Sequence, residues 1–291
     1  MLESLATCPY HRPKGEAAQQ TAMNDNFHQG EIGSGRFRPI SELLLSLRFL
    51  TRLPIPFART VDPVPLASAM RMFAVAGAFV GALNGLVLVG LSYLHLPGLI
   101  GAVLTVGFGL FLTGALHEDG LADTTDGLFG GRTRERRLEI MRDSRIGTYG
   151  ACALILALLI RVEAYQALVT YPMWQAIAIL SAVGAFSRAM VVDMIWATRP
   201  ARTDGLSALA GRPSRNTGLF AIVTGGALAV WAGWPTAPIL GAEAMLVALV
   251  ITGLIRRLAT RLVGGQTGDI CGAAQVLVEI GMMLTYLASI H

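Results

Sequence analysis

Long apolar runs separated by short polar segments fill most of the chain after about residue 70. A helix needs about 20 mostly apolar residues to span a bilayer, and seven stretches meet or approach that length. These stretches are residues 73–94, 98–116, 147–169, 174–196, 218–233, 237–255 and 271–290. The two around Pro235 are the weakest, and Arg161 and Glu163 interrupt the third. The pattern predicts an all-α fold, a polytopic integral membrane bundle of about seven transmembrane helices.

The first part of the chain lacks this pattern. Residues 1–40 are polar and rich in Gly, Gln and Asn, without the apolar core of a signal peptide. We therefore expect a disordered cytoplasmic tail before a membrane-embedded domain at residues 41–291. From Ile40, the segment ISELLLSLRFLTRLPIP places Arg48 and Arg52 at helical spacing before two prolines. It predicts an amphipathic segment at the membrane interface, with arginines that extend into the headgroup region.

Arginines are distributed unevenly among the loops between the predicted spans. They gather in three alternate loops, at residues 117–146, 197–217 and 256–270. The intervening loops carry no Arg or Lys, at residues 95–97, 170–173 and 233–236. Cytoplasmic loops hold an excess of basic residues. We therefore expect a multi-pass protein of the inner membrane in which the acidic loop, residues 117–146, and the active site both face the cytoplasm.

Composition supports the membrane assignment and limits the chemistry. The chain is 53% hydrophobic and 14% charged, whereas soluble domains have about 25% charged residues. Lys14 is the only lysine among 23 basic residues, a bias compatible with phosphate binding by arginine and equally with codon preference. The cysteines Cys8, Cys152 and Cys271 are far apart and form no CxxC pair, so neither a disulfide framework nor a zinc site is indicated.

The segment HEDGLADTTDGLFGG, residues 117–131, places three carboxylates directly after an apolar run. On a helix, Asp123 lies roughly 40° and Asp126 roughly 20° from Asp119, so all three share one face. Carboxylates this close repel each other unless a cation lies between them, and oxygen ligands favour Mg²⁺ or Mn²⁺. The alternative is a solvated loop with salt bridges. A metal at the mouth of a bundle would serve phosphate chemistry.

His117 and Glu118 precede the carboxylates. His117 is two residues before Asp119 and points away from the carboxylate face of a regular helix. It could be a general base, a residue that orients a ligand, or an interfacial histidine. We expect Glu118 to be an exposed neighbour.

The residues that follow the acidic segment suit phosphate binding. Gly130 and Gly131 permit close backbone approach, and RTRERR supplies guanidinium groups. The next motif, RDSRIGTYG, contains a further acid, Asp143, and Arg145 two residues later.

Two later segments on the same side repeat this mixture of residues. Arg188 and Asp193 stand in the body of a predicted span, where ionisable groups are functional or paired, and both interpretations stay open. In GGQTGDICGA, Asp269 follows three glycines, and Thr267 with neighbouring N–H groups could form an anion-binding nest. We favour a functional role for Asp269.

Four motifs together resemble one enzyme family. They are FLTRLPIP near the start, HEDGLADTTDG from His117, IMRDSRIGTYG from Ile140 and GGQTGDICG from Gly264. They resemble cobalamin synthase, the multi-pass adenosylcobinamide-GDP ribazoletransferase family, from about residue 41 to the C-terminus. The resemblance implies that α-ribazole, or its 5′-phosphate, attacks the cobinamide-bearing phosphorus of adenosylcobinamide-GDP. GMP would leave, and adenosylcobalamin or its 5′-phosphate would form.

The resemblance also implies roles for individual residues in a Mg²⁺-dependent transfer. Asp119, Asp123 and Asp126 correspond to metal ligands, with Asp143 and Asp269 as further candidates, and a carboxylate or His117 would deprotonate the ribazole hydroxyl. The candidates for phosphate and substrate binding are Arg142, Arg145, Gly130, Gly131, Arg188, Thr267 and Asp269. The expected partners are these substrates and the lipid bilayer, together with a second copy or other cobalamin-pathway enzymes, and no nucleic acid.

Two other functions remain as alternatives. A CDP-alcohol phosphotransferase also uses clustered aspartates, but its DG-x-x-A-R spacing is absent, since LADTTDG follows Asp119 and Gly120. In a cation-coupled transporter the acids would bind the coupling ion, usually near the bilayer midplane. The dense acidic cluster at one surface argues for an enzyme, although Arg188 and Asp193 keep the transporter open.

Overall fold

The computed structural model describes residues 37–55, 64–203, 205, 210–234 and 238–288. The tail predicted for residues 1–40 lies outside these ranges, apart from its last four residues. Within the described ranges the named elements are all helices: α2 Pro39–Leu50, α3 Leu66–Ala69, η1 Met70–Met72, α4 Phe73–Ser92, α5 Gly98–Thr113, α6 Leu116–Gly130, α7 Arg134–Ile140, α8 Thr148–Leu168, α9 Met173–Ala197, α11 Arg215–Gly233, α12 Pro238–Val263 and α13 Gly268–Ala288. The predicted all-α membrane bundle is confirmed.

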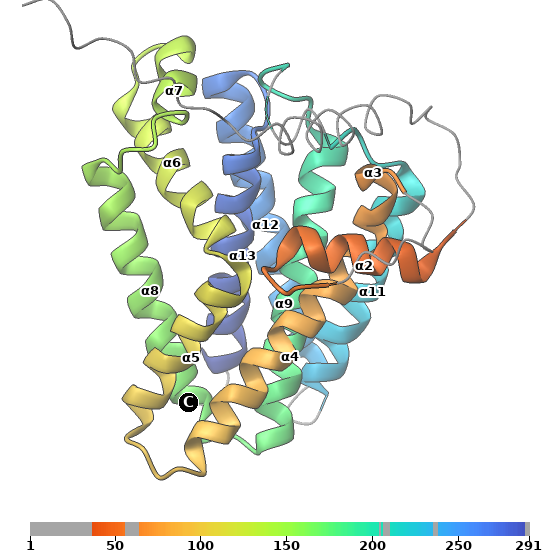
Figure 1. The fold of residues 1–291 in the computed structure, drawn as a ribbon, viewed down its shortest axis with the longest axis vertical. Coiled ribbons are helices and arrows are strands. Elements are labelled where there is room, and N and C mark those ends of the chain that lie inside the picture. The colour runs from red at the N-terminus through yellow and green to blue at the C-terminus, as the bar shows by residue number, and fades with distance from the viewer. Residues whose placement is uncertain (1–36, 56–63, 204, 206–209, 235–237, 289–291) are drawn as a thin grey trace, which may run out of the picture. The chain divides into compact units, whose positions relative to one another are not determined.

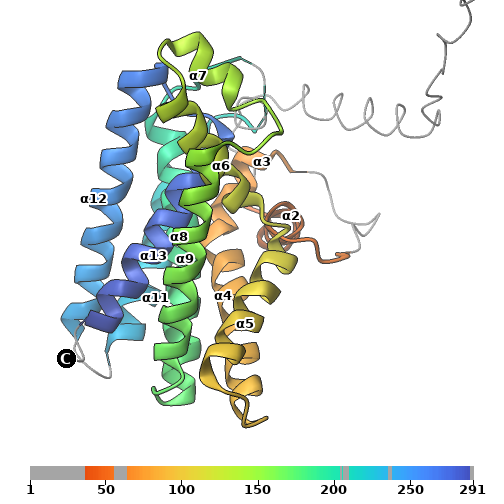
Figure 2. The same cartoon turned by 90° about the vertical axis from the view of Figure 1, so that its left-hand side faces the viewer.

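Six helices of the described residues are long and apolar enough to cross a membrane. A seventh span exists only if α5 and α6, bent by 89° at their junction, count as one. Figures 1 and 2 show α4 ending and α8 beginning at opposite ends of the bundle, so the bent pair carries the chain between those ends. About seven spans is therefore right, but residues 98–116 are not a complete span. The acidic segment, expected in a loop, forms helix α6.

The break between α5 and α6 has a local cause. Gly114 and Ala115 both adopt left-handed backbone angles, with φ of 66° and 54°, which end α5 and redirect the chain. A Cβ at Gly114 would overlap the Arg52 guanidinium. The backbone N–H of Arg52 also donates to Leu112 O at 2.7 Å, so the segment after α2 lies against the end of α5.

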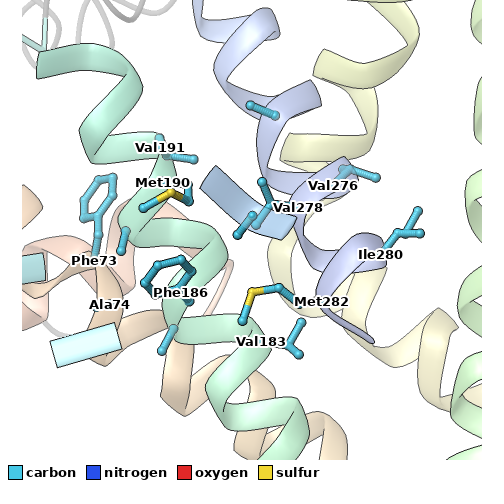
Figure 3. Close-up of a cluster of buried hydrophobic side chains, with 14 of the residues drawn as sticks. Phe73, Ala74, Val183, Phe186, Met190, Val191, Val276, Val278, Ile280 and Met282 are labelled. Atoms are coloured by element: carbon cyan, nitrogen blue, oxygen red, sulfur yellow. The ribbon is translucent and has the colours of Figure 1, made fainter. Parts of the chain in front are cut away.

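Helix α9 forms the centre of the bundle, since 83% of its apolar membrane-spanning stretch is buried by other helices. Helix α4 packs closely on α9, because a Cβ at Gly77 would overlap the backbone of Gly184. Figure 3 shows part of the apolar core, where Phe186 of α9 lies among side chains from α4 and α13. Glycines on both helices therefore permit this close packing.

Helix α2 runs across the bundle helices near α3 and α4 (Figure 1). The buried Ser46 hydroxyl donates to Ala69 O at 2.8 Å, and Glu42 pairs with Arg71 at 3.5 Å. Arg48 is exposed, as an amphipathic helix requires. A helix is thus present where the segment was predicted and is attached to the bundle through polar contacts, but it ends at Leu50, so Arg52 follows it. Its position at the membrane interface stays a prediction.

Candidate active site

The predicted acidic segment meets the later GGQTGDICG motif where α6 crosses α13. A Cβ at Gly120 would lie 2.7 Å from Asp269 O, so the two backbones touch at this point. The contact brings the Asp269 carboxylate within electrostatic range of Asp119, and that of Asp123 within range of both. Asp119 is exposed, whereas Asp123 and Asp269 are half-buried. Two motifs about 150 residues apart therefore share one carboxylate cluster.

Arg202 joins this cluster and was not among the residues predicted from sequence. Its Nη2 lies 3.3 Å from Asp269 Oδ2, and its side chain is 15% exposed. Backbone hydrogen bonds from Ala201 N to Gln266 O and from Gln266 N to Arg199 O hold its segment beside the start of α13. The loop at residues 197–217 contains several arginines, so only the tertiary contact distinguishes this one. We call Asp119, Asp123, Arg202 and Asp269 the crossing site.

Asp126 has a different role from the one predicted. Its two carboxylate oxygens accept backbone N–H groups of Gly147, at 2.7 Å, and Gly150, at 2.9 Å. A Cβ at either glycine would overlap that carboxylate. Asp126 therefore stabilises the N-terminus of α8, where a negative charge is favourable. The IGTYG motif is explained by this contact, and a metal-ligand role for Asp126 stays a prediction.

No three His, Cys, Asp or Glu side chains of the described residues lie close enough together to hold a metal ion by themselves. The prediction that Asp119, Asp123 and Asp126 share one cation is therefore not supported, because seven helical residues separate the outer pair by about 10 Å along the axis. Mg²⁺ is usually bound by one or two carboxylates together with substrate phosphates and water. The carboxylate oxygens of the crossing site fit that open arrangement.

Asp143 and Arg145 pair with each other in the exposed loop before α8. Arg145 Nη2 lies 2.6 Å from Asp143 Oδ2, and the backbone N–H of Arg145 also donates to this carboxylate. These hydrogen bonds lower the pKa of Asp143 to about 2. Arg142 is exposed beside them. The structure does not join these residues to the crossing site, so their metal and phosphate roles stay predictions.

Gly130 and Gly131 pack against α7. A Cβ at Gly131 would lie 2.6 Å from Arg137 Cγ, and one at Gly130 would make an ordinary contact with Ile140. Arg137 donates to Leu128 O at 3.2 Å and Arg134 to Val263 O at 2.8 Å, so these guanidinium groups bind the carbonyls at the ends of α6 and α12. The close approach that we predicted for a substrate is made by a neighbouring helix.

Thr267 stabilises the start of α13. Its buried hydroxyl accepts the Ile270 N–H and donates to Asp269 Oδ2, both at 3.2 Å. Thr267 is therefore a helix cap that also orients the Asp269 carboxylate, and its predicted role in an anion-binding nest stays a prediction.

His117, Glu118 and Arg188 belong to the bundle interior. Glu118 pairs with Arg161, and Glu279 of α13 lies 3.2 Å from Arg161 and 3.0 Å from Arg188. All four charged residues are buried, so Glu118 is not the exposed neighbour that we expected. His117 is 5% exposed, which separates it from the open face where a general base would act.

Arg188 and Asp193 do not pair with each other. Arg188 contacts Glu279, and Asp193 of α9 contacts Arg256 of α12. Both are tertiary ion pairs that join α9 to another helix. Arg188 is buried and paired with Glu279, and its predicted role in binding phosphate stays a prediction.

Comparisons with known proteins agree with the sequence motifs. The family model described as cobalamin-5-phosphate synthase matches residues 42–287. A protein of Xanthobacter autotrophicus is 46% identical over 86% of this chain and 97% of its own length. Relatives from Azorhizobium caulinodans and Bradyrhizobium diazoefficiens are 42% and 43% identical, over 86% of this chain and 96% and 94% of their own lengths. All three are named adenosylcobinamide-GDP ribazoletransferase.

No solved structure matches the chain. The family model nevertheless covers every residue of the crossing site, and the relatives align along most of their length. The chain belongs to the cobalamin-5-phosphate synthase family.

Proposed function

We propose that this protein transfers the adenosylcobinamide-phosphate group of adenosylcobinamide-GDP to α-ribazole or its 5′-phosphate. GMP is released, and adenosylcobalamin or its 5′-phosphate is formed, the last step of nucleotide-loop assembly. The observation that carries the proposal is the crossing site, where carboxylates and one guanidinium meet at an open face of the bundle. The names of the relatives support the same reaction.

The reaction exchanges one phosphorus–oxygen bond for another. The riboside hydroxyl oxygen bonds to the cobinamide-bearing phosphorus, the anhydride bond to the GMP phosphate breaks, and the bonding electrons leave with GMP. The hydroxyl proton must pass to a base within hydrogen-bond reach. We assign this role to the carboxylate pair Asp119 and Asp123, because both are accessible at the crossing and His117 is enclosed by helix packing.

Mg²⁺, or Mn²⁺ in its place, completes the proposed site. Asp119 and Asp123, with Asp269 as a further ligand, would hold the cation, which would supply positive charge to the diphosphate and to the leaving phosphate oxygens. Arg202 adds a permanent cation beside them, because guanidinium stays protonated. The protein groups thus position the diphosphate next to the carboxylate that accepts the proton.

The proposed orientation of the protein in the membrane rests on the distribution of its arginines. The arginine-bearing loops lie together at the end of the bundle that carries α7 (Figure 1). On the positive-inside rule, we propose that this end faces the cytoplasm and that the membrane is the inner membrane. A large amphipathic corrinoid could approach along the membrane surface while its diphosphate enters the crossing site. A second copy or other pathway enzymes as partners stay predictions.

The test uses purified protein in liposomes with adenosylcobinamide-GDP and either α-ribazole or its 5′-phosphate. GMP and the corrinoid product are followed by chromatography, with Mg²⁺ or with EDTA. We expect both products to form together, and to be lost with EDTA and in Asp123→Asn. Glu139→Gln, in an exposed pair with Arg136 on α7, is the matched control and should retain activity.

Near-normal turnover in a folded Asp123→Asn protein would remove this carboxylate from the mechanism. Formation of neither product, with either riboside, would refute the proposed transfer. The same liposomes with a CDP-alcohol would then test the phosphotransferase alternative.

A further inference from the structure

Arg202 makes an incomplete contact with Asp269. A guanidinium can donate two parallel hydrogen bonds to a carboxylate, yet here only Nη2 contacts Asp269, at 3.3 Å from Oδ2. The Thr267 hydroxyl donates to the same oxygen. The other terminal nitrogen, Nη1, is buried and has no hydrogen-bond partner within the described part of the chain. The guanidinium therefore has donor capacity that Asp269 does not use.

Hydrogen bonds hold the backbone around Arg202 in place, whereas its guanidinium has one hydrogen-bonded partner among the described residues, Asp269. Ala201 N–H donates to Gln266 O at 2.8 Å, and Ala201 O accepts from Arg134 at 2.7 Å. A Cβ at Gly205, where φ is +101°, would lie 3.2 Å from Arg202 Nε, so the following backbone runs beside the guanidinium. A long side chain on a fixed backbone can change partners without moving the helices.

The charges at the crossing site make such an exchange favourable. Arg202 is a cation among three carboxylates, so a metal ion bound at this site would compete with it for Asp269. A diphosphate offers the planar fork two oxygens in the geometry that it prefers. We propose that Arg202 is a substrate-binding residue that exchanges partners, pairing with Asp269 in the free protein and with the diphosphate when substrate binds. The exchange frees Asp269 for the cation.

This inference rests on the proposed function for the identity of the diphosphate, but not for the competition with the metal. The critical variant is Arg202→Gln, which removes the charge and keeps much of the side chain. Mn²⁺ binding without nucleotide is measured by electron paramagnetic resonance, and GDP binding at fixed Mg²⁺ by calorimetry, both in nanodiscs. We expect Mn²⁺ to bind roughly tenfold more tightly and GDP roughly tenfold more weakly, within the range typical of coupled sites.

The opposite signs distinguish this role from a purely structural one. Loss of local structure would weaken both ligands, and Arg202→Lys should keep the competition with Mn²⁺ but lose part of the GDP affinity, since an ammonium lacks the fork. Arg199→Gln, an exposed arginine three residues earlier, is the matched control and should change neither ligand.

Weaker binding of both ligands in Arg202→Gln, or no change in either, would overturn the exchange. The Mn²⁺ measurement needs no turnover, so it can contradict the exchange even if transfer is confirmed. Conversely, Arg202→Gln could bind Mn²⁺ more tightly even if the unmodified protein forms no corrinoid product. That result would support the competition between Arg202 and the metal ion and would refute only the proposed function. Melting curves of all variants check that they fold.

Discussion

The buried charges of the bundle permit a quantitative test of its stability. Arg161 and Arg188 are balanced by Glu118 and Glu279, so the group is formally neutral. Glu279 is the shared partner, at 3.2 Å from one guanidinium and 3.0 Å from the other, and it is 9% exposed. The substitution Glu279→Gln leaves an uncompensated positive charge in the interior with almost no change in volume.

The expected cost follows from that charge. Removing one partner of a buried ion pair destabilises a protein by about 3–5 kcal/mol, because the remaining charge stays desolvated. For a chain of this size we expect the melting temperature to fall by about 6–20 °C. Glu139→Gln removes a carboxylate from an exposed pair, 2.8 Å from Arg136, and should change the stability by less than about 1 kcal/mol.

The assay is thermal unfolding of the purified protein in one detergent, followed by circular dichroism. The double variant Arg188→Met with Glu279→Leu keeps the Arg161 and Glu118 pair and restores formal neutrality. We therefore expect it to be less destabilised than Glu279→Gln alone, since apolar replacement of a whole pair is often tolerated. A Glu279→Gln protein as stable as the Glu139→Gln control, or a double variant at least as destabilised as Glu279→Gln, would refute the reasoning.

Two further predictions concern the start of α8 and the loop that precedes it. Gly150→Ala should destabilise the protein by about 3 kcal/mol or more, because its Cβ would overlap the Asp126 carboxylate and displace a buried hydrogen bond. Gly107→Ala, with nothing within 4 Å of its Cβ, should be neutral in the same melting experiment. The pKa of Asp143 is lowered to about 2, so its contact with Arg145 is present above the ordinary pKa of 3.8 and is lost only as pH falls through about 2. Asp143→Asn should therefore leave the pH dependence of melting above about pH 5 unchanged, and a new titration step there would contradict this assignment.

The sequence by itself determined the properties that depend on neighbouring residues. The lengths of the apolar runs predicted the helices and their approximate number. This works because a segment that crosses a bilayer must satisfy its own backbone hydrogen bonds, which a helix does. Arginine-bearing loops alternated with uncharged ones, which predicted the two ends of the bundle. Helical periodicity placed Asp119 and Asp123 on one face, and the spaced motifs indicated the family that the comparisons then confirmed.

The tertiary structure alone decided which distant groups meet. Asp126 acquired backbone partners that periodicity did not predict, because two glycines of the next motif bring N–H groups to its carboxylate. Arg202 was distinguished from the other loop arginines by its contact with Asp269, and Arg188 proved to pair with Glu279 and not with Asp193. Periodicity and hydropathy describe one helix at a time. The partner of a charged side chain depends on helix crossings, and those are set by where glycine backbones can touch.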